Sequence, residues 1–169
     1  MAKVENYDVV IIGSGPGGYV AAVRAAQLDM KVACIEKEPR LGGVCLNVGC
    51  IPSKALLDSS EYYHLAREQF AAHGIKTGRV SLDLATMMAR KEKVIQDQIK
   101  GLQKLFDHHR IRYISGSGRI LQAGAVEIAP PDGAVEMVEW DRLILATGSR
   151  PMDLPGLAVD GRRIISSND

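Results

Sequence analysis

Two cysteines with four residues between them stand in a glycine-rich stretch of the sequence, "LGGVCLNVGCIPSKALL" (41–57). Cys45 and Cys50 can close a small disulfide ring if the chain brings their Cα atoms within about 4.4–6.8 Å. Pro52 suits the first turn of a helix. The positive N-terminus of that helix, together with Lys54, would stabilise a thiolate at Cys50. The spacing therefore favours thiol–disulfide chemistry.

Two other interpretations of this pair stay open on the local sequence. Free cysteines are often small buried hydrophobic side chains that do no chemistry. A zinc site needs about four ligands. The remaining candidates, Cys34 and the His108–His109 pair, fall on a predicted strand and at a distant helix end. We therefore predict no metal site, and we expect Cys34 to lie in the core.

A second group of residues indicates nucleotide binding. In "GSGPGG", Gly13, Gly15 and Gly18 form the G-x-G-x-x-G pattern, in which the glycines allow a tight turn, a close approach to pyrophosphate, and helix–strand packing. The helix that follows presents free N–H groups and a positive dipole to phosphate. Glu36 ends the next predicted strand, where an acidic side chain binds ribose hydroxyls and disfavours a 2′-phosphate. The pattern predicts a dinucleotide site but does not distinguish FAD from NAD.

A strand–helix–strand unit is predicted to position these residues. The run 7–13 is apolar and rich in β-branched residues, which is typical of a central strand in a parallel sheet. Small and apolar side chains recur at helical spacing in 19–28, and the apolar run 31–36 predicts the second strand. Such a unit is expected to have a right-handed crossover.

Two longer helices are predicted beyond this unit. After a glycine-rich loop at 41–49, the first helix is predicted at 52–72, and a glycine of "HGIKTG" is predicted to end it. Ser81 is predicted to cap the second helix, which runs to about residue 108 and carries an apolar stripe.

Short strands are predicted in the last third of the chain, at 111–115, 118–122, 125–129 and 135–140, with a turn at "PPDG". The run 142–149 repeats the apolar-strand-to-glycine pattern and is predicted to join the central sheet. The predicted fold class is α/β, a Rossmann-like domain with a central parallel sheet. A two-helix excursion at about 52–109 and a small β-meander at about 117–140 complete it.

Composition and charge exclude several classes of function. Lys and Arg number 21 and Asp and Glu 20 in 169 residues, so no electrostatic attraction to nucleic acid or an anionic membrane surface is expected. No apolar run approaches the roughly 20 residues that span a bilayer. The N-terminus shows no signal-peptide pattern, so we predict a cytoplasmic location. Cysteine pairs in that compartment are more often catalytic, redox-sensing or metal-binding than structural.

The segment "GGVCLNVGCIPSK" closely resembles the redox-active segment of the FAD-dependent pyridine nucleotide–disulfide oxidoreductases. The resemblance extends to "DVVIIGSGPGGYVAAVRAAQL", to Glu36, to the helix pair with "HGI", to "GSG" at 116–118 and to "LILATGSRP". Within the family, "CLNVGCIPSKALL" is most similar to members that oxidise dihydrolipoyl groups, whereas glutathione and mercuric reductases usually carry "CVNVGCVP". Many members have threonine where this chain has Val44.

The resemblance implies a role for each matching residue. Cys50 would lie against the flavin, Cys45 would exchange with a dithiol substrate, and Lys54 would lie near the reactive nitrogen of the flavin. The residues implied to bind the cofactor are Gly13, Ser14, Gly15, Pro16, Gly17, Gly18, Glu36, Lys37, Gly42, Gly43, Val44, Cys45, Lys54, Gly118, Ala146, Thr147 and Gly148.

The resemblance also implies what the parent enzyme does. It would use FAD to oxidise the dihydrolipoyl group of a lipoyl-bearing protein, in a 2-oxoacid dehydrogenase or glycine cleavage complex, and would reduce NAD⁺ as a homodimer. Residues 1–169 would form the N-terminal part of its FAD-binding domain, without the NAD-binding and dimer-interface domains, and we expect this chain alone to be inactive. The alternatives are a glutathione- or mercuric-type disulfide reductase, a non-catalytic flavin-binding module and a metal-binding structural domain.

Overall fold

The computed structural model describes residues 4–122, 124–152 and 154–166. Its β-strands form a six-stranded sheet in the order β3-β2-β1-β6-β5-β4. The first four strands in this order are mutually parallel, and β5 and β4 continue the sheet antiparallel. The strand bounds are β1 Glu5–Ile12, β2 Val32–Glu36, β3 Arg112–Ser115, β4 Ser117–Gln122, β5 Ala125–Ala129 and β6 Glu136–Leu145. The predicted α/β class with a central parallel sheet is confirmed.

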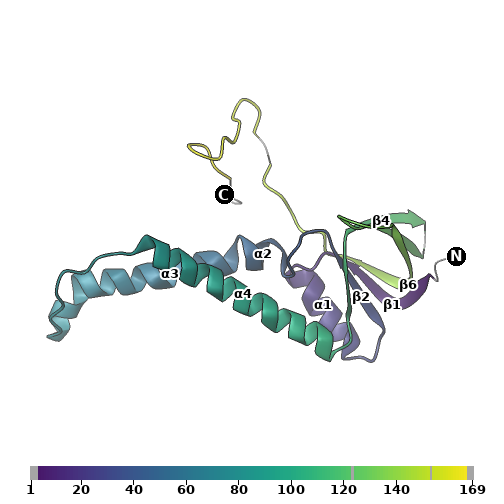
Figure 1. Ribbon diagram of the computed structural model, residues 1–169, viewed down its shortest axis with the longest axis horizontal. Coiled ribbons are helices and arrows are strands. Elements are labelled where there is room, and N and C mark those ends of the chain that lie inside the picture. Colours follow the sequence, from purple (N-terminus) through teal and green to yellow (C-terminus); the bar gives the residue numbers. More distant parts are fainter. Residues whose placement is uncertain (1–3, 123, 153, 167–169) are drawn as a thin grey trace.

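The helices divide into one that packs on the sheet and a pair that extends from it. Helix α1 (Pro16–Ala26) joins β1 to β2. Helix α3 and the long helix α4 run side by side as an arm that projects from the sheet (Figure 1). The remaining bounds are α2 Gly43–Asn47, α3 Cys50–His64, a π-helical turn Leu65–Gln69, a 3-10 turn Phe70–His73 and α4 Leu84–His108.

Two hydrophobic cores lie on the two faces of the parallel strands. Alternate residues of a strand point to opposite faces, so Cys34 of β2 joins one core while Ile35 joins the other. The first core packs under α1 and the C-terminal half of α4, with Phe106 1% exposed. The second core lies against β5 and the start of β6. Cys34 is fully buried, as predicted, and burial raises its pKa to about 12.

The last strand differs from its prediction. Residues 135–140 and 142–149 were expected to form two strands, but Glu136–Leu145 is one strand. It pairs in parallel with β1 from Val138 to Leu145, and its first residues also pair antiparallel with β5. The polar residue Asp141 was expected to separate the two strands. It remains within one strand because pairing with β1 outweighs its low local strand propensity.

The helices differ from their predictions in three respects. Asp83, not Ser81, caps α4, since its carboxylate accepts the Thr86 N–H at 3.1 Å. The predicted loop 41–49 contains the short helix α2. The regular part of the helix expected at 52–72 ends at His64 and continues as π- and 3-10-helical turns to His73. Gly74 then adopts a left-handed conformation at φ 74°, which confirms the predicted glycine stop.

Candidate functional site

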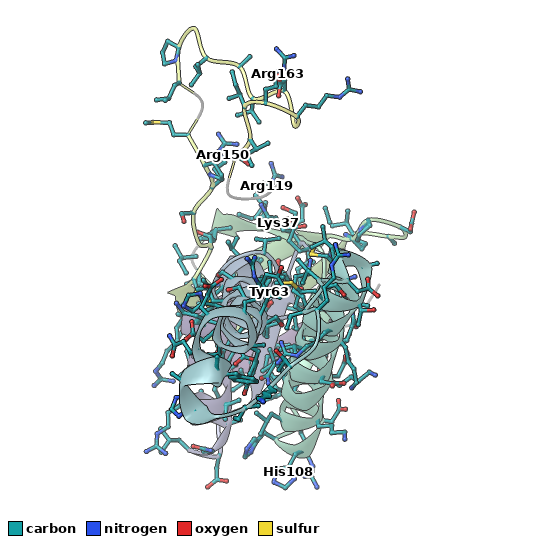
Figure 2. All side chains as sticks on the ribbon, turned by 90° about the vertical axis from the view of Figure 1, so that its left-hand side faces the viewer. Lys37, Tyr63, His108, Arg119, Arg150 and Arg163 are labelled. Atoms are coloured by element: carbon teal, nitrogen blue, oxygen red, sulfur yellow. The ribbon has the colours of Figure 1, made fainter. Side chains whose placement is uncertain are left out.

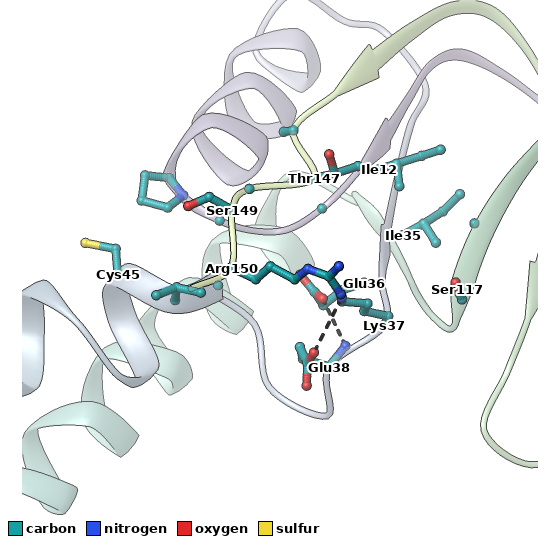
Figure 3. Close-up of a pocket in the computed structure, with 18 of the residues that line it drawn as sticks. Ile12, Ile35, Glu36, Lys37, Glu38, Cys45, Ser117, Thr147, Ser149 and Arg150 are labelled. Carbon is teal, nitrogen blue, oxygen red and sulfur yellow. Dashed lines mark hydrogen bonds and ion pairs between the residues drawn. The ribbon is translucent and has the colours of Figure 1, made fainter. Parts of the chain in front are cut away.

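A cavity of about 410 Å³ opens where β1, β2 and β6 end (Figure 3). Open parallel sheets bind ligands at this carboxyl edge. Cys45 lies at one end of the drawn cluster and Ser117 at the other, with Glu36 and Arg150 between them. The lining residues are Ile12, Gly13, Gly15, Pro16, Ile35, Glu36, Lys37, Glu38, Gly43, Val44, Cys45, Gly116, Ser117, Gly118, Ala146, Thr147, Gly148, Ser149 and Arg150.

The three motif glycines occupy positions that suit their expected roles. Gly13 has φ +103°, and a Cβ there would lie 2.2 Å from the carbonyl oxygen of Ala146. A Cβ on Gly18 would lie 1.8 Å from the Gly13 carbonyl oxygen, so only glycine lets α1 approach β1 this closely. A Cβ on Gly15 would meet nothing closer than the Gly43 Cα at 3.9 Å, so this backbone is open to the cavity. Helix α1 begins at this point without a side-chain cap, which leaves its N–H groups free for an anion.

Glu36 lies in the wall of the cavity with its carboxylate held on two sides. Its Oε2 accepts the Ser14 N–H at 2.8 Å and the Ser14 hydroxyl at 2.7 Å. Its Oε1 accepts the Glu38 N–H at 2.9 Å. The Glu36 residue is 6% exposed. The carboxylate is therefore oriented before any ligand arrives.

The two cysteines meet at the corner between α2 and α3. Cys45 lies in α2 and is half-buried, and Cys50 is the first residue of α3 and is exposed. The neighbouring Cys50 side chain, followed by burial, raises the pKa of Cys45. Both are free thiols in the structure. The two cysteines are thus close neighbours, as a pair that opens and closes a disulfide requires.

Helix α2 packs closely against the glycine loop at residues 13–18. Gly42 and Gly43 both have positive φ, at 102° and 61°, and turn the chain into α2. A Cβ on Gly43 would lie 2.6 Å from the Gly15 Cα, so the two backbones touch. The Asn47 side-chain amide donates to the carbonyl oxygens of Leu41 and Gly43 at 3.0 and 2.9 Å. These contacts hold Cys45 at the cavity edge.

The cavity brings most of the predicted site residues together. Lys54 is exposed on α3 one turn after Cys50, and neither residue lines the cavity. Ser14, Gly18 and Gly42 are buried behind the cavity wall, and Gly17 is exposed on α1. The predicted residues that line the cavity are Gly13, Gly15, Pro16, Glu36, Lys37, Gly43, Val44, Cys45, Gly118, Ala146, Thr147 and Gly148.

Sequence reasoning missed several residues of the cavity wall. Ile12 and Ile35 are the hydrophobic ends of β1 and β2, a position that could have been read from the strand pattern. Arg150 lies on the segment after β6, which leaves the sheet on the side from which the arm projects, turns away from the arm and carries Arg163 farther out (Figures 1 and 2). The other missed residues are Glu38, Gly116, Ser117 and Ser149.

Neither a metal cluster nor a membrane span is found in the part of the chain that the structure describes. There, no group of three or more His, Cys, Asp or Glu side chains is placed to hold a metal ion. No helix within the same residues combines the length and apolar character that a bilayer crossing needs.

Comparison with known proteins decides the family. The profile described as "pyridine nucleotide-disulphide oxidoreductase" matches residues 7–169. The chain belongs to the pyridine nucleotide-disulphide oxidoreductase family. The resemblance inferred from the cysteine segment and the glycine loop is thereby confirmed.

Relatives within the pyridine nucleotide-disulphide oxidoreductase family are similar over nearly all of this chain. Leghemoglobin reductase of Vigna unguiculata is 50% identical over 163 residues, which cover 96% of this chain and 31% of the relative. Mitochondrial dihydrolipoyl dehydrogenase of Pisum sativum is 48% identical over 163 residues, 96% of this chain and 32% of the relative. Dihydrolipoyl dehydrogenase 3 of Pseudomonas aeruginosa is 47% identical over 165 residues, 97% and 35%. The chain spans about a third of the length of these relatives.

Proposed function

We propose that this chain is the N-terminal FAD-binding and disulfide-bearing portion of a dihydrolipoyl dehydrogenase. The observation that carries the proposal is that Cys45, with Cys50 as its neighbour, lines the same cavity as the glycine loop and Glu36. One cysteine of the proposed dithiol-reactive pair thus lies in the cavity that would hold the dinucleotide. Identities of 48% and 47% to dihydrolipoyl dehydrogenases support this substrate class.

The residues present fit FAD. Gly13, Gly15 and the free N–H groups of α1 suit its pyrophosphate, and Glu36 suits the adenosine ribose. Gly118 belongs to the part of the wall contributed by the β3–β4 connection and β4, and Cys45 to the part contributed by α2. When bound, FAD supplies a two-electron acceptor beside the cysteines, and in the longer protein NAD⁺ is the final acceptor.

The cysteines carry the thiol chemistry. A substrate thiolate attacks the Cys45 sulfur of the Cys45–Cys50 disulfide, which forms a mixed disulfide and releases Cys50 as a thiolate. The second thiolate of the substrate then attacks the substrate sulfur that is bonded to Cys45. This closes the disulfide of the substrate and releases Cys45 as a thiolate. The substrate leaves as a disulfide, and its two electrons remain on the cysteine pair. Lys54, one turn after Cys50 on α3, adds positive charge near that thiolate.

An absorbance spectrum of the purified chain tests the proposal. We expect oxidised-flavin absorption and, after two-electron reduction, a long-wavelength shoulder that reports a thiolate beside the ring. Cys50→Ser should remove the shoulder and keep the flavin, whereas Cys34→Ala, which changes the buried third cysteine, should keep both. A chain that binds no added FAD, or a shoulder that survives Cys50→Ser, would contradict the proposal.

The partners, domains and location are part of the same proposal. The dithiol is carried by a lipoyl-bearing protein of a 2-oxoacid dehydrogenase or glycine cleavage complex, and the longer protein is a homodimer with separate NAD-binding and interface domains. Residues 1–169 form part of the FAD-binding domain, with the helical excursion at about 52–109 and the meander at about 117–140. The relatives include proteins named mitochondrial and a bacterial protein, so a cytoplasmic location stays a prediction.

A second candidate function comes from the name of one relative. The 50% identity to leghemoglobin reductase favours a test of electron transfer to a ferric haem protein. The longer protein, given NADH, should reduce lipoamide faster than ferric leghemoglobin if the first proposal holds. The reverse order would favour the second candidate.

A further inference from the structure

Ser14 differs from the other residues of the glycine loop because its side chain faces the interior. It is 0% exposed and does not line the cavity. Its hydroxyl donates to Glu36 Oε2 at 2.7 Å. The oxygen of the same hydroxyl accepts the Gly42 N–H at 3.2 Å. The hydroxyl is therefore fixed on both sides, by the end of β2 and by the residue that precedes α2.

The hydrogen bonds to Glu36 determine which of its oxygens can bind a ligand. An ionised carboxylate offers roughly four lone-pair sites, two on each oxygen. The Ser14 N–H and hydroxyl occupy both sites of Oε2. The Glu38 N–H occupies one site of Oε1, which leaves a single site on Oε1 for a donor in the cavity.

We propose that Ser14 is a positioning residue that holds Glu36 so that Oε1 accepts one ribose hydroxyl of the bound nucleotide. The inference rests on the nucleotide site of the proposed function and assigns Ser14 a task other than direct contact with the cofactor. Without the Ser14 hydroxyl, Oε2 regains a free site and the carboxylate can turn. Affinity for the ribose hydroxyls then falls, while the phosphate contacts of the glycine loop remain.

A calorimetric titration compares ADP with 2′,3′-dideoxy-ADP, which lacks the hydroxyls but keeps the base and the phosphates. The wild-type chain should bind ADP about tenfold more tightly than the dideoxy compound, the effect of a hydrogen bond to a charged group. Ser14→Ala should reduce this preference to about twofold and leave affinity for the dideoxy compound within about twofold of wild type. Ser60→Ala, which removes an exposed hydroxyl on α3, should change neither value.

A double-mutant cycle separates positioning from a general loss of structure. If Ser14 acts through Glu36, Ser14→Ala should have no further effect on the ADP preference in the Glu36→Gln background. A wild-type preference retained in Ser14→Ala would overturn the inference and leave the proposed function intact. An equal loss of affinity for both compounds would also overturn it, because that result indicates only a disturbed fold. A wild-type chain that binds neither ADP nor FAD would overturn both.

Discussion

At the scale of single residues, the site depends on close backbone contacts. Gly43 touches Gly15, and this contact joins the segment that carries Cys45 to the glycine loop that we propose binds pyrophosphate. The Asn47 amide reinforces the same turn by donating to the Gly43 carbonyl oxygen. The distance from Cys45 to the proposed nucleotide site therefore depends on the close approach of Gly43 to Gly15.

Gly43→Ala should therefore destabilise the chain more than glycine strain alone explains. A residue other than glycine at φ 61° costs about 1–2 kcal/mol. The new Cβ would also lie 2.6 Å from the Gly15 Cα, which adds about 1–3 kcal/mol of overpacking. Gly74→Ala is the matched control, since Gly74 has φ 74° and no atom near the new Cβ. Urea unfolding measures both variants, and equal losses of unfolding free energy would contradict the proposed contact.

At the scale of elements, α4 must be held at both ends so that its C-terminal half can cover the parallel strands. Asp83 caps its N-terminus through Thr86, and hydrogen bonds from the Thr86 hydroxyl and N–H lower the pKa of Asp83. Phe106 is buried in the core near the other end. The last turns of α4 thus pack on the sheet, while its N-terminal half forms the arm with α3 (Figure 1).

The Asp83 cap should make the stability of α4 depend on pH at the acidic end. The pKa of Asp83 is lowered in the folded chain, so its contribution is complete above the ordinary carboxyl pKa and is lost as the pH falls through the folded value. Asp83→Ser keeps a capping oxygen that does not titrate in this range. Helicity followed by circular dichroism below pH 4 should therefore fall more steeply in wild type than in Asp83→Ser. Identical acid profiles would contradict this role.

Phe106→Ala should cost about 3–5 kcal/mol of unfolding free energy, because the ring is 1% exposed in the core beneath α4. Leu105→Ala, at the neighbouring and 46% exposed position, is the control and should cost far less. Thermal or urea unfolding of the two variants measures the difference. A small loss for Phe106→Ala would show that α4 does not pack on the sheet as described.

At the scale of the whole molecule, the proposed function assigns this chain one nucleotide site and one redox-active cysteine pair. The G-x-G-x-x-G pattern occurs once in its 169 residues. The chain spans about a third of its relatives. Under the proposed function, a complete cycle of dithiol oxidation and NAD⁺ reduction would also use a second dinucleotide site and an acid–base group in the longer protein.

We therefore expect the 169-residue chain to show no NAD⁺-dependent oxidation of dihydrolipoamide and no NADH-dependent diaphorase activity, even with added FAD. The longer protein, assayed in parallel under the same conditions, should show both. Stoichiometric reaction of the oxidised chain with a dithiol should still reduce the Cys45–Cys50 pair, which a thiol assay can count. Steady NADH oxidation by the chain alone would contradict this expectation.

The sequence by itself determined the local features of this protein. The run "YDVVIIGSGPGG", Glu36 and the two cysteines predicted the strand, the turn and the kind of chemistry, because these depend on neighbours along the chain. Tertiary structure alone decided that β6 is one strand, since its continuity comes from pairing with β1. The hidden position of Ser14 and the place of Arg150 in the cavity wall likewise depend on segments distant in sequence that meet at the sheet edge. The local sequence pattern does not predict such tertiary contacts, because they form only when the strands assemble into the sheet.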